Sequence, residues 1–278
     1  MKNILIPTDF SDNSLNAIRY ALDYFANIPV NFYVLHVRGN KQFQKKEGDE
    51  LVFEESATLL IQGPKIRLDE QIKTCNLLAK NPSHNFHPLL EEGRLVETIR
   101  QYVGEKEIDY IVMGTKGASK ISQNEIGSNT CEVITKVKCP ILVIPEHAKF
   151  KGIRNTAFLT DYNCLYRNKV ISTLSETLEL QKSALRILHS RTQNASLTPS
   201  QVDNKGFLHY FFRETKHSFH LMDNKNMEAG IQDFVDTWDI TLLAIVAKNL
   251  NFIQKLLLRR ATETIDYHTE LPFLVIHE

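Results

Sequence analysis

Three glycines, spaced three and then ten residues apart, are the residues of this chain best suited to binding chemistry. Gly114-Thr115-Lys116-Gly117 is followed after nine residues by Gly127-Ser128-Asn129. Gly114 directly follows the apolar run 110–113, where a residue without Cβ lets the backbone approach a flat ligand or adopt a positive φ. Gly127 and Ser128 open the next expected helix, whose unpaired N–H groups and positive dipole end favour an anion. This pattern predicts that a phosphate group binds between the strand and the helix.

Each of these residues also has a purely structural interpretation. Gly127-Ser128 alone is typical of a turn and a helix N-cap, Gly114 of a strand-to-loop turn, and Asp9 of a carboxylate that caps a helix. Lys116, Lys120 or both would add positive charge against a phosphate, and the sequence does not decide between them. Only the combination, at one spacing within one βα unit, favours a nucleotide.

The first half of the chain alternates apolar strand patterns with helical ones. The polar, Lys-rich stretch 38–49 predicts a protruding loop. Strands joined by helical crossovers lie parallel, and strands that are apolar throughout need both faces covered, so this half predicts a doubly wound parallel sheet with its ligand edge at the carboxyl ends of the strands. The expected strands are 3–8, 30–37, 85–90, 110–113 and 141–144, and the expected helices follow the patterns around 12–25, 59–78, 94–106 and 128–137.

The same order of motifs returns in the second half. Residues 155–161 echo 3–9, and each run closes on Thr-Asp; residues 185–190 mirror 32–37, and 271–276 mirror 139–144. The repeat predicts an α/β protein of two repeated, doubly wound, parallel five-stranded sheet domains, at 1–147 and 152–278. No glycine follows Gly230, so side chains would fill the space that phosphate needs, and nucleotide is expected in the first domain only.

Together these motifs resemble the universal stress protein family. Gly114 to Ser128 is similar to its G-2x-G-9x-G-(S/T) nucleotide motif, and the first two strands end in Pro7-Thr8-Asp9 and His36-Val37 as in that family. The resemblance is strong over 1–146 and weaker over 154–278. It implies a Rossmann-like, adenine-nucleotide α-hydrolase-like fold, ATP with or without Mg²⁺ as ligand, and pairing of strands 141–144 and 273–276 within one chain. The nucleotide-binding residues it implies are Pro7, Thr8, Asp9, Val37, Met113, Gly114, Lys116, Gly117, Gly127, Ser128 and Asn129.

Composition and charge narrow the function further. Lys plus Arg and Asp plus Glu number 33 each, so the basic footprint of a nucleic-acid-binding protein is missing. No run approaches the ~20 apolar residues of a membrane span, and the start of the chain lacks a signal-peptide core, so a cytoplasmic location is expected. The scattered Cys75, Cys131, Cys139 and Cys164 fit reduced thiols. No metal site or redox cofactor is expected, because no matching ligand set or dinucleotide motif occurs.

The leading hypothesis is a stress-response or signalling module controlled by an adenine nucleotide. No nucleophile is paired with a base, so no catalytic residue is assigned and ATP hydrolysis is expected to be slow at most. An alternative is a nucleotide-independent interaction or apolar-ligand-binding protein, built as an intramolecular pseudo-dimer, since the stretch 252–258 is unusually apolar. A third is an enzyme of the related α-hydrolase group. A protein partner and a further homodimer stay open.

Overall fold

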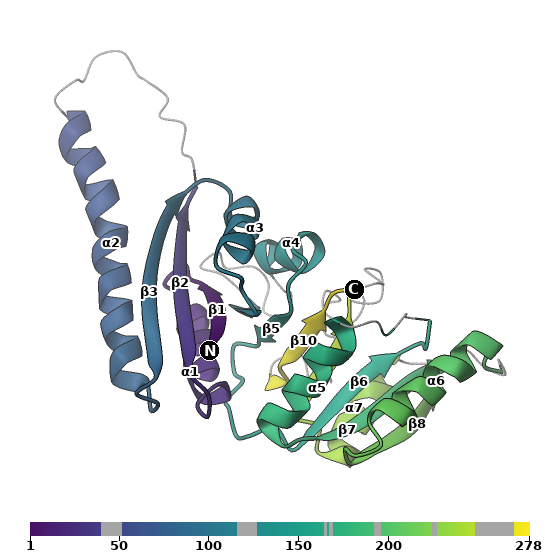
Figure 1. Ribbon diagram of the computed structural model, residues 1–278. Coiled ribbons are helices and arrows are strands. Elements are labelled where there is room, and N and C mark those ends of the chain that lie inside the picture. Colours follow the sequence, from purple (N-terminus) through teal and green to yellow (C-terminus); the bar gives the residue numbers. More distant parts are fainter. Residues whose placement is uncertain are drawn as a thin grey trace.

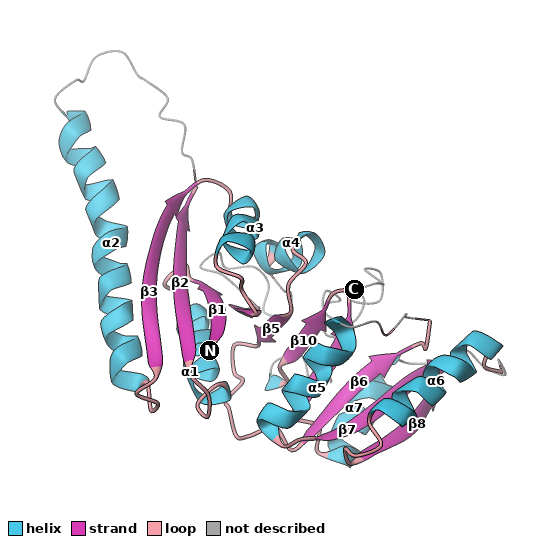
Figure 2. Ribbon diagram, viewed as in Figure 1, coloured by secondary structure: helices cyan, strands magenta, loops and turns pink. Residues whose placement is uncertain are grey.

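The protein forms one ten-stranded sheet with helices on both faces (Figures 1 and 2). The computed structural model describes residues 1–39, 52–115, 127–163, 166, 169–191, 196–223, 227–247 and 270–278. The first half comprises β1 (Lys2–Pro7), α1 (Asp12–Tyr24), β2 (Val30–Arg38), α2 (Val52–Leu78), β3 (His84–Glu92), α3 (Leu95–Glu105), β4 (Tyr110–Gly114), α4 (Ser128–Lys136) and β5 (Ile141–Ile144). The second half comprises β6 (Asn155–Thr160), α5 (Lys169–Gln181), β7 (Ala184–Arg191), α6 (Pro199–Phe211), β8 (His217–Asp223), α7 (Met227–Trp238), β9 (Leu242–Val246) and β10 (Phe273–Ile276).

The sheet consists of two five-stranded parallel halves that meet at their last strands. The strand order is β3-β2-β1-β4-β5-β10-β9-β6-β7-β8, so the second half repeats the first in reverse across the sheet. β5 and β10 pair antiparallel, with Leu142 opposite Leu274 and Val143 opposite Phe273. The predicted doubly wound fold and the predicted pairing of the two fifth strands are both confirmed. β5 ends before Pro145, which has no backbone N–H to continue the ladder.

Two apolar layers hold the helices on the sheet. Along β1, Ile4 and Ile6 face one layer and Leu5 faces the other, because successive side chains of a strand alternate between faces. Helices α1, α2, α5 and α6 contribute to the layer of Ile4, and α3, α4 and α7 to the layer of Leu5. All three side chains are at most 1% exposed, which explains why the strands are apolar throughout rather than alternating.

The observed elements begin and end within a few residues of the predicted ones. α1 begins after the N-cap Ser11, whose hydroxyl accepts from the Ser14 backbone N–H. Helix α2 is longer than the predicted helix 59–78 and begins at Val52. Most of the expected loop at 38–49 lies outside the described residues, although Arg38 still belongs to β2. Of the cysteines, Cys75, Cys131 and Cys139 form no disulfide, and Cys164 lies outside the described residues.

Polar contacts away from the central strands also join the two halves. The Lys2 ammonium binds the Glu176 carboxylate of α5 at 3.0 Å, and the Gln181 side-chain amide donates to the Tyr24 carbonyl at 2.8 Å. These contacts lie on the face of the sheet that carries α1 and α5. The halves are therefore joined by side-chain contacts as well as by the β5–β10 ladder.

Candidate functional site

The predicted site lies where the direction of strand connection changes. β1 has β2 on one side and β4 on the other, so the chain leaves β1 in one direction and returns to its other side at β4. Open α/β sheets bind ligands at such switch points, beyond the carboxyl ends of the strands. A cavity of about 140 Å³ opens there. Its lining residues are Pro7, Thr8, Asp9, Ser14, His36, Val37, Leu95, Met113, Gly114, Gly127, Ser128, Asn129 and Thr130.

The structure brings most of the predicted site residues together in this one cavity. Nine of the eleven are among its lining residues, and they come from the ends of β1, β2 and β4 and from the start of α4. The remaining two, Lys116 and Gly117, lie outside the described residues, as does Lys120. Residues 116–126 connect β4 to α4 in sequence and lie outside the described residues.

The end of β1 is shaped by a chain of short polar contacts. Asp9 Oδ1 accepts from the Ser11 backbone N–H at 3.0 Å and from the Ser11 hydroxyl at 2.6 Å. The Ser11 oxygen in turn accepts from the Ser14 N–H. The hydrogen bonds at Asp9 thus position the capping serine, and Ser11 itself caps the helix. Asp9 therefore does not cap the helix itself, as considered from the sequence, but holds the serine that does, and it also lines the cavity.

His36 fixes the adjoining edge of the site and was not among the predicted residues. Its Nδ1 donates to the Thr8 carbonyl at 2.8 Å, which ties the end of β2 to the end of β1. The ring lies 4.3 Å from the ring of Phe10, centroid to centroid. Phe10 has a φ of 63°, a conformation that costs a non-glycine residue about 1–3 kcal/mol. The His-Val strand ending was visible in the sequence, but its contact with Phe10 depends on the fold.

Two hydrogen bonds connect the end of β4 to the start of α4. The Gly127 N–H donates to the Thr115 carbonyl at 2.6 Å, and the Thr130 hydroxyl donates to the Gly114 carbonyl at 2.9 Å. Gly127 is the N-cap of α4 and makes no side-chain capping bond. The first-turn N–H groups of α4 therefore face the cavity side without a side-chain cap, which suits an anionic ligand. Thr130 is a further lining residue that sequence reasoning missed.

The two glycines of the motif that the structure describes, Gly114 and Gly127, do not have the backbone roles that the sequence suggested. Gly127 has φ −59° and ψ 146°, which any residue adopts, so the backbone does not require glycine there. At Gly114 an added Cβ would lie 2.8 Å from Oδ1 and 2.9 Å from Cγ of Asn13. Gly114 therefore makes room for the Asn13 side chain of α1, a packing role that the sequence interpretation did not include. Both residues still line the cavity.

The second half repeats the strand-end geometry without the glycine. His189 Nδ1 donates to the Thr160 carbonyl at 3.0 Å, and its ring lies 4.6 Å from that of Tyr162, which has a φ of 58°. Val246 pairs with Ile276 as Gly114 pairs with Ile144. A branched side chain thus stands at the strand position that glycine occupies in the first half. Residues 248–269, which follow β9 in the second half, lie outside the described residues.

Burial keeps the nearest thiol protonated. Cys131, on the first turns of α4, is half-buried, and this burial raises its pKa to about 11. A thiol with that pKa is a poor nucleophile at neutral pH. Within the described ranges, no three His, Cys, Asp or Glu side chains gather as a metal site.

Comparisons with known proteins place the chain in a family. The model of the universal stress protein family matches residues 1–145. Universal stress protein MJ0531 of Methanocaldococcus jannaschii is 30% identical over 148 residues, which are 53% of this chain and 84% of that protein. Universal stress protein MJ0577 of the same organism is 27% identical over 51% of this chain and 94% of its own length. The chain belongs to the universal stress protein family.

Solved structures extend the likeness in fold to both halves. A universal stress protein from Archaeoglobus fulgidus superposes with a TM-score of 0.66 at 16% identity, covering 99% of this chain and 96% of that one. PA1789 from Pseudomonas aeruginosa, described as functionally unknown, gives a TM-score of 0.57 at 13% identity over 100% of this chain and 92% of its own. Both halves of the chain therefore share the fold of these structures. None of the helices in the described residues is long and apolar enough to cross a membrane.

Proposed function

We propose that the first half of this chain binds an adenine nucleotide, ATP with or without Mg²⁺, at the cavity between β1, β4 and α4. The observation that carries the proposal is the convergence of nine predicted residues, from four separate segments, on one cavity. Glycine, serine and asparagine at the start of α4 lie on one side of that cavity, and Asp9, Val37 and Met113 come from the strand ends.

Because the cavity is small, we divide the proposed nucleotide between the cavity and the start of α4. Its volume of about 140 Å³ is below the roughly 300–1,000 Å³ of a complete small-molecule site. We place the purine in the cavity, against Val37 and Met113, and the phosphates along the first turn of α4. Lys116 or Lys120, which the sequence singled out, would add positive charge against the phosphates.

Nucleotide binding is proposed for the domain of residues 1–147 and not for that of residues 152–278. Val246 supports this division, since its side chain stands at the strand position of Gly114. Nucleotide occupancy in the first domain would shift the balance between two conformations or partner surfaces, as in a stress-response or signalling module of the cytoplasm. Hydrolysis is at most slow, because the proposed binding residues include no nucleophile paired with a base.

The experiment compares the purified chain with its Gly127→Val variant. Mass spectrometry of the denatured wild-type protein should show released adenine nucleotide, and the variant should lose it together with at least ~10-fold in ATP affinity, ~1.4 kcal/mol. Valine tolerates the φ of −59° at this residue, so folding is expected to survive. Gly206→Val on α6, where an added Cβ meets nothing within 4 Å, is the matched control. An empty wild-type protein that does not bind millimolar ATP would refute the proposal.

A second candidate function, association independent of nucleotide, is favoured by the outer face of α6. Phe207 is 43% exposed, Tyr210 67% and Phe211 44%, all on one helix. Clustered exposed aromatic residues are characteristic of interaction surfaces. Under this candidate two copies associate through α6, and Tyr210→Glu converts a dimer to a monomer in sedimentation velocity with ATP affinity unchanged. A monomeric wild-type chain at high concentration would refute it.

A further inference from the structure

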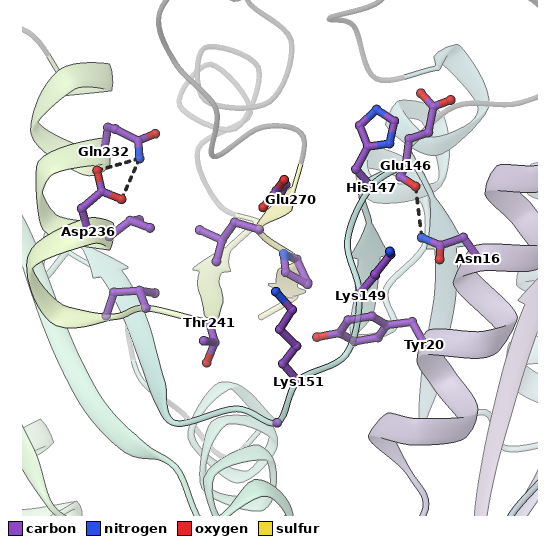
Figure 3. A pocket seen from close by; sticks show the side chains of 15 residues that line it. Asn16, Tyr20, Glu146, His147, Lys149, Lys151, Gln232, Asp236, Thr241 and Glu270 are labelled. Atoms are coloured by element: carbon purple, nitrogen blue, oxygen red, sulfur yellow. Dashed lines mark hydrogen bonds between the residues drawn. The ribbon is translucent and has the colours of Figure 1, made fainter.

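A second and larger cavity lies between the two halves of the molecule. This central cleft has a volume of about 750 Å³, within the roughly 300–1,000 Å³ range of small-molecule sites. It lies between α1 and α7, beside the segment 145–152 that joins the halves (Figure 3). None of its lining residues belongs to the proposed nucleotide cavity. The central cleft is therefore a separate candidate site.

The Tyr20 side chain gives the α1 side of the cleft a polar group. Tyr20 is only 3% exposed, and its ring packs edge-on against Phe150 at a centroid distance of 5.3 Å. Its hydroxyl makes no hydrogen bond with any described residue, and Figure 3 shows it directed toward Lys151 in the cleft. Burial raises the pKa of Tyr20, so the phenol stays protonated. The hydroxyl is open to the cleft and offers a neutral hydrogen-bond donor to a ligand there.

Two lysines from the connecting segment extend into the same space. Lys149 and Lys151 are both exposed and line the cleft, and neither forms an ion pair within the described ranges of the chain. Their backbone is held in place by α1, because the Asn16 amide donates to the carbonyls of Pro145 at 3.2 Å and of Ala148 at 3.0 Å. The positive charges are thus carried by an anchored segment, and Figure 3 shows Lys151 beside the Tyr20 hydroxyl.

The opposite side of the cleft is apolar in part. Ile240 and Leu271 line it and are 5% and 6% exposed. Two carboxylates also lie on this side. Asp236 accepts from the Gln232 amide at 3.0 Å along α7, and Figure 3 shows it turned to that partner, away from the lysines. Glu270 on this side and Glu146 on the connecting segment are the other acidic side chains that line the cleft. Figure 3 shows the Glu146 carboxylate directed away from Lys151 and the Tyr20 hydroxyl, so Glu270 is the carboxylate that would oppose an anion there.

We propose that the central cleft binds a small organic anion. Its carboxylate or phosphate group lies between Lys149, Lys151 and the Tyr20 hydroxyl, and its apolar body packs on Ile240 and Leu271. Two ammonium groups and one neutral donor satisfy the charged end, and the apolar surface shields the remainder from water. Because both halves contribute, the ligand fixes their relative position, and its chemistry is separate from nucleotide binding in the first half.

The experiment uses the fluorescent probe anilinonaphthalenesulfonate, which joins an anionic group to an apolar body, with the full chain freed of nucleotide. Tyr20→Phe should weaken binding about 10-fold, since a hydrogen bond to a charged group is lost. The thermal midpoint of the variant should not fall, because the hydroxyl that is removed has no partner. The double variant Lys149→Gln, Lys151→Gln should weaken binding more than 10-fold. Glu270→Gln should tighten it about two-fold, because a repulsive charge is removed.

Two controls separate this site from others that an anionic dye can occupy. Lys216→Gln removes an exposed cation of the second half that does not line the cleft and should leave the affinity unchanged. Gly127→Val should also leave it unchanged, because Gly127 lines the proposed nucleotide cavity and not the central cleft. Equal affinity in wild type, Tyr20→Phe and the double lysine variant would overturn the proposal. A loss in Gly127→Val equal to that in the lysine variant would overturn it as well, and so would a wild-type chain that does not bind the probe.

Discussion

Replacing Gly114 by alanine tests whether this glycine serves packing, ligand approach or both. The added Cβ would lie 2.8 Å from Oδ1 of Asn13, whereas ordinary contacts begin at 3.4 Å, so about 0.6 Å of space is missing (3.4 − 2.8). Asn13 is 6% exposed and cannot simply swing into solvent. Overpacking of this kind costs about 1–3 kcal/mol. At roughly 2–4 °C per kcal/mol for a chain of this size, the midpoint should fall by about 2–12 °C.

A double-mutant cycle with Asn13→Ala isolates the contact. Gly114→Ala, Asn13→Ala and the double variant are each unfolded in urea and by heat. If the clash is the cause, the double variant is less destabilised than the sum of the two single ones by about 1–3 kcal/mol. The single Asn13→Ala variant is included because it corrects for the other contacts of the asparagine. Destabilisations that add to within about 0.5 kcal/mol would refute the packing account.

The same four proteins separate packing from ligand contact. If Gly114 only accommodates Asn13, ATP affinity returns in the double variant together with stability. If the backbone of Gly114 also approaches the nucleotide, stability returns while affinity stays low, because the new methyl group still lies at the cavity. Isothermal titration with ATP distinguishes the two outcomes. Unchanged affinity in the Gly114→Ala single variant would show that this residue does not border the bound nucleotide.

Three further perturbations follow from the packing and the charges. Gly104→Ala in α3 should raise the free energy of unfolding by about 0.4–1 kcal/mol, because an added Cβ there meets nothing within 4 Å; a loss in urea denaturation would contradict this. Leu274→Ala in β10, whose side chain is fully buried opposite Leu142, should cost about 2–5 kcal/mol, and a cost under 1 kcal/mol would show that the two halves are not packed at this pair. Burial, with smaller contributions from Lys169 and Lys138, lowers the pKa of His277, so the unfolded chain takes up the proton first and stability should fall as the pH drops below about 6.5. His277→Gln should flatten that pH dependence in thermal denaturation, and an unchanged slope would rule out this histidine as its source.

Local sequence patterns determined the elements of this protein. Ser11 placed the start of α1, and Pro145 the end of β5, because capping and the missing N–H of proline act within a few residues. The Thr-Asp endings of β1 and β6 exposed the repeat, and alternation of strands and helices then fixed the parallel order within each half. The rule that ligands bind at the carboxyl ends of such strands was sufficient to bring Asp9, Met113 and Gly127 to one site.

The tertiary structure alone decided how these elements fit against one another. Gly114 meets Asn13 across about a hundred residues of sequence, and the His36 ring reaches Phe10 from the neighbouring strand. Neither contact has a spacing that a local pattern encodes. The antiparallel joining of β5 to β10 brings α1 and α7 to the two sides of the central cleft, and only there does the hydroxyl of Tyr20 face a cavity. Chemistry that depends on residues distant in the chain follows from packing, because sequence periodicity records which face of an element is buried but not what it is buried against.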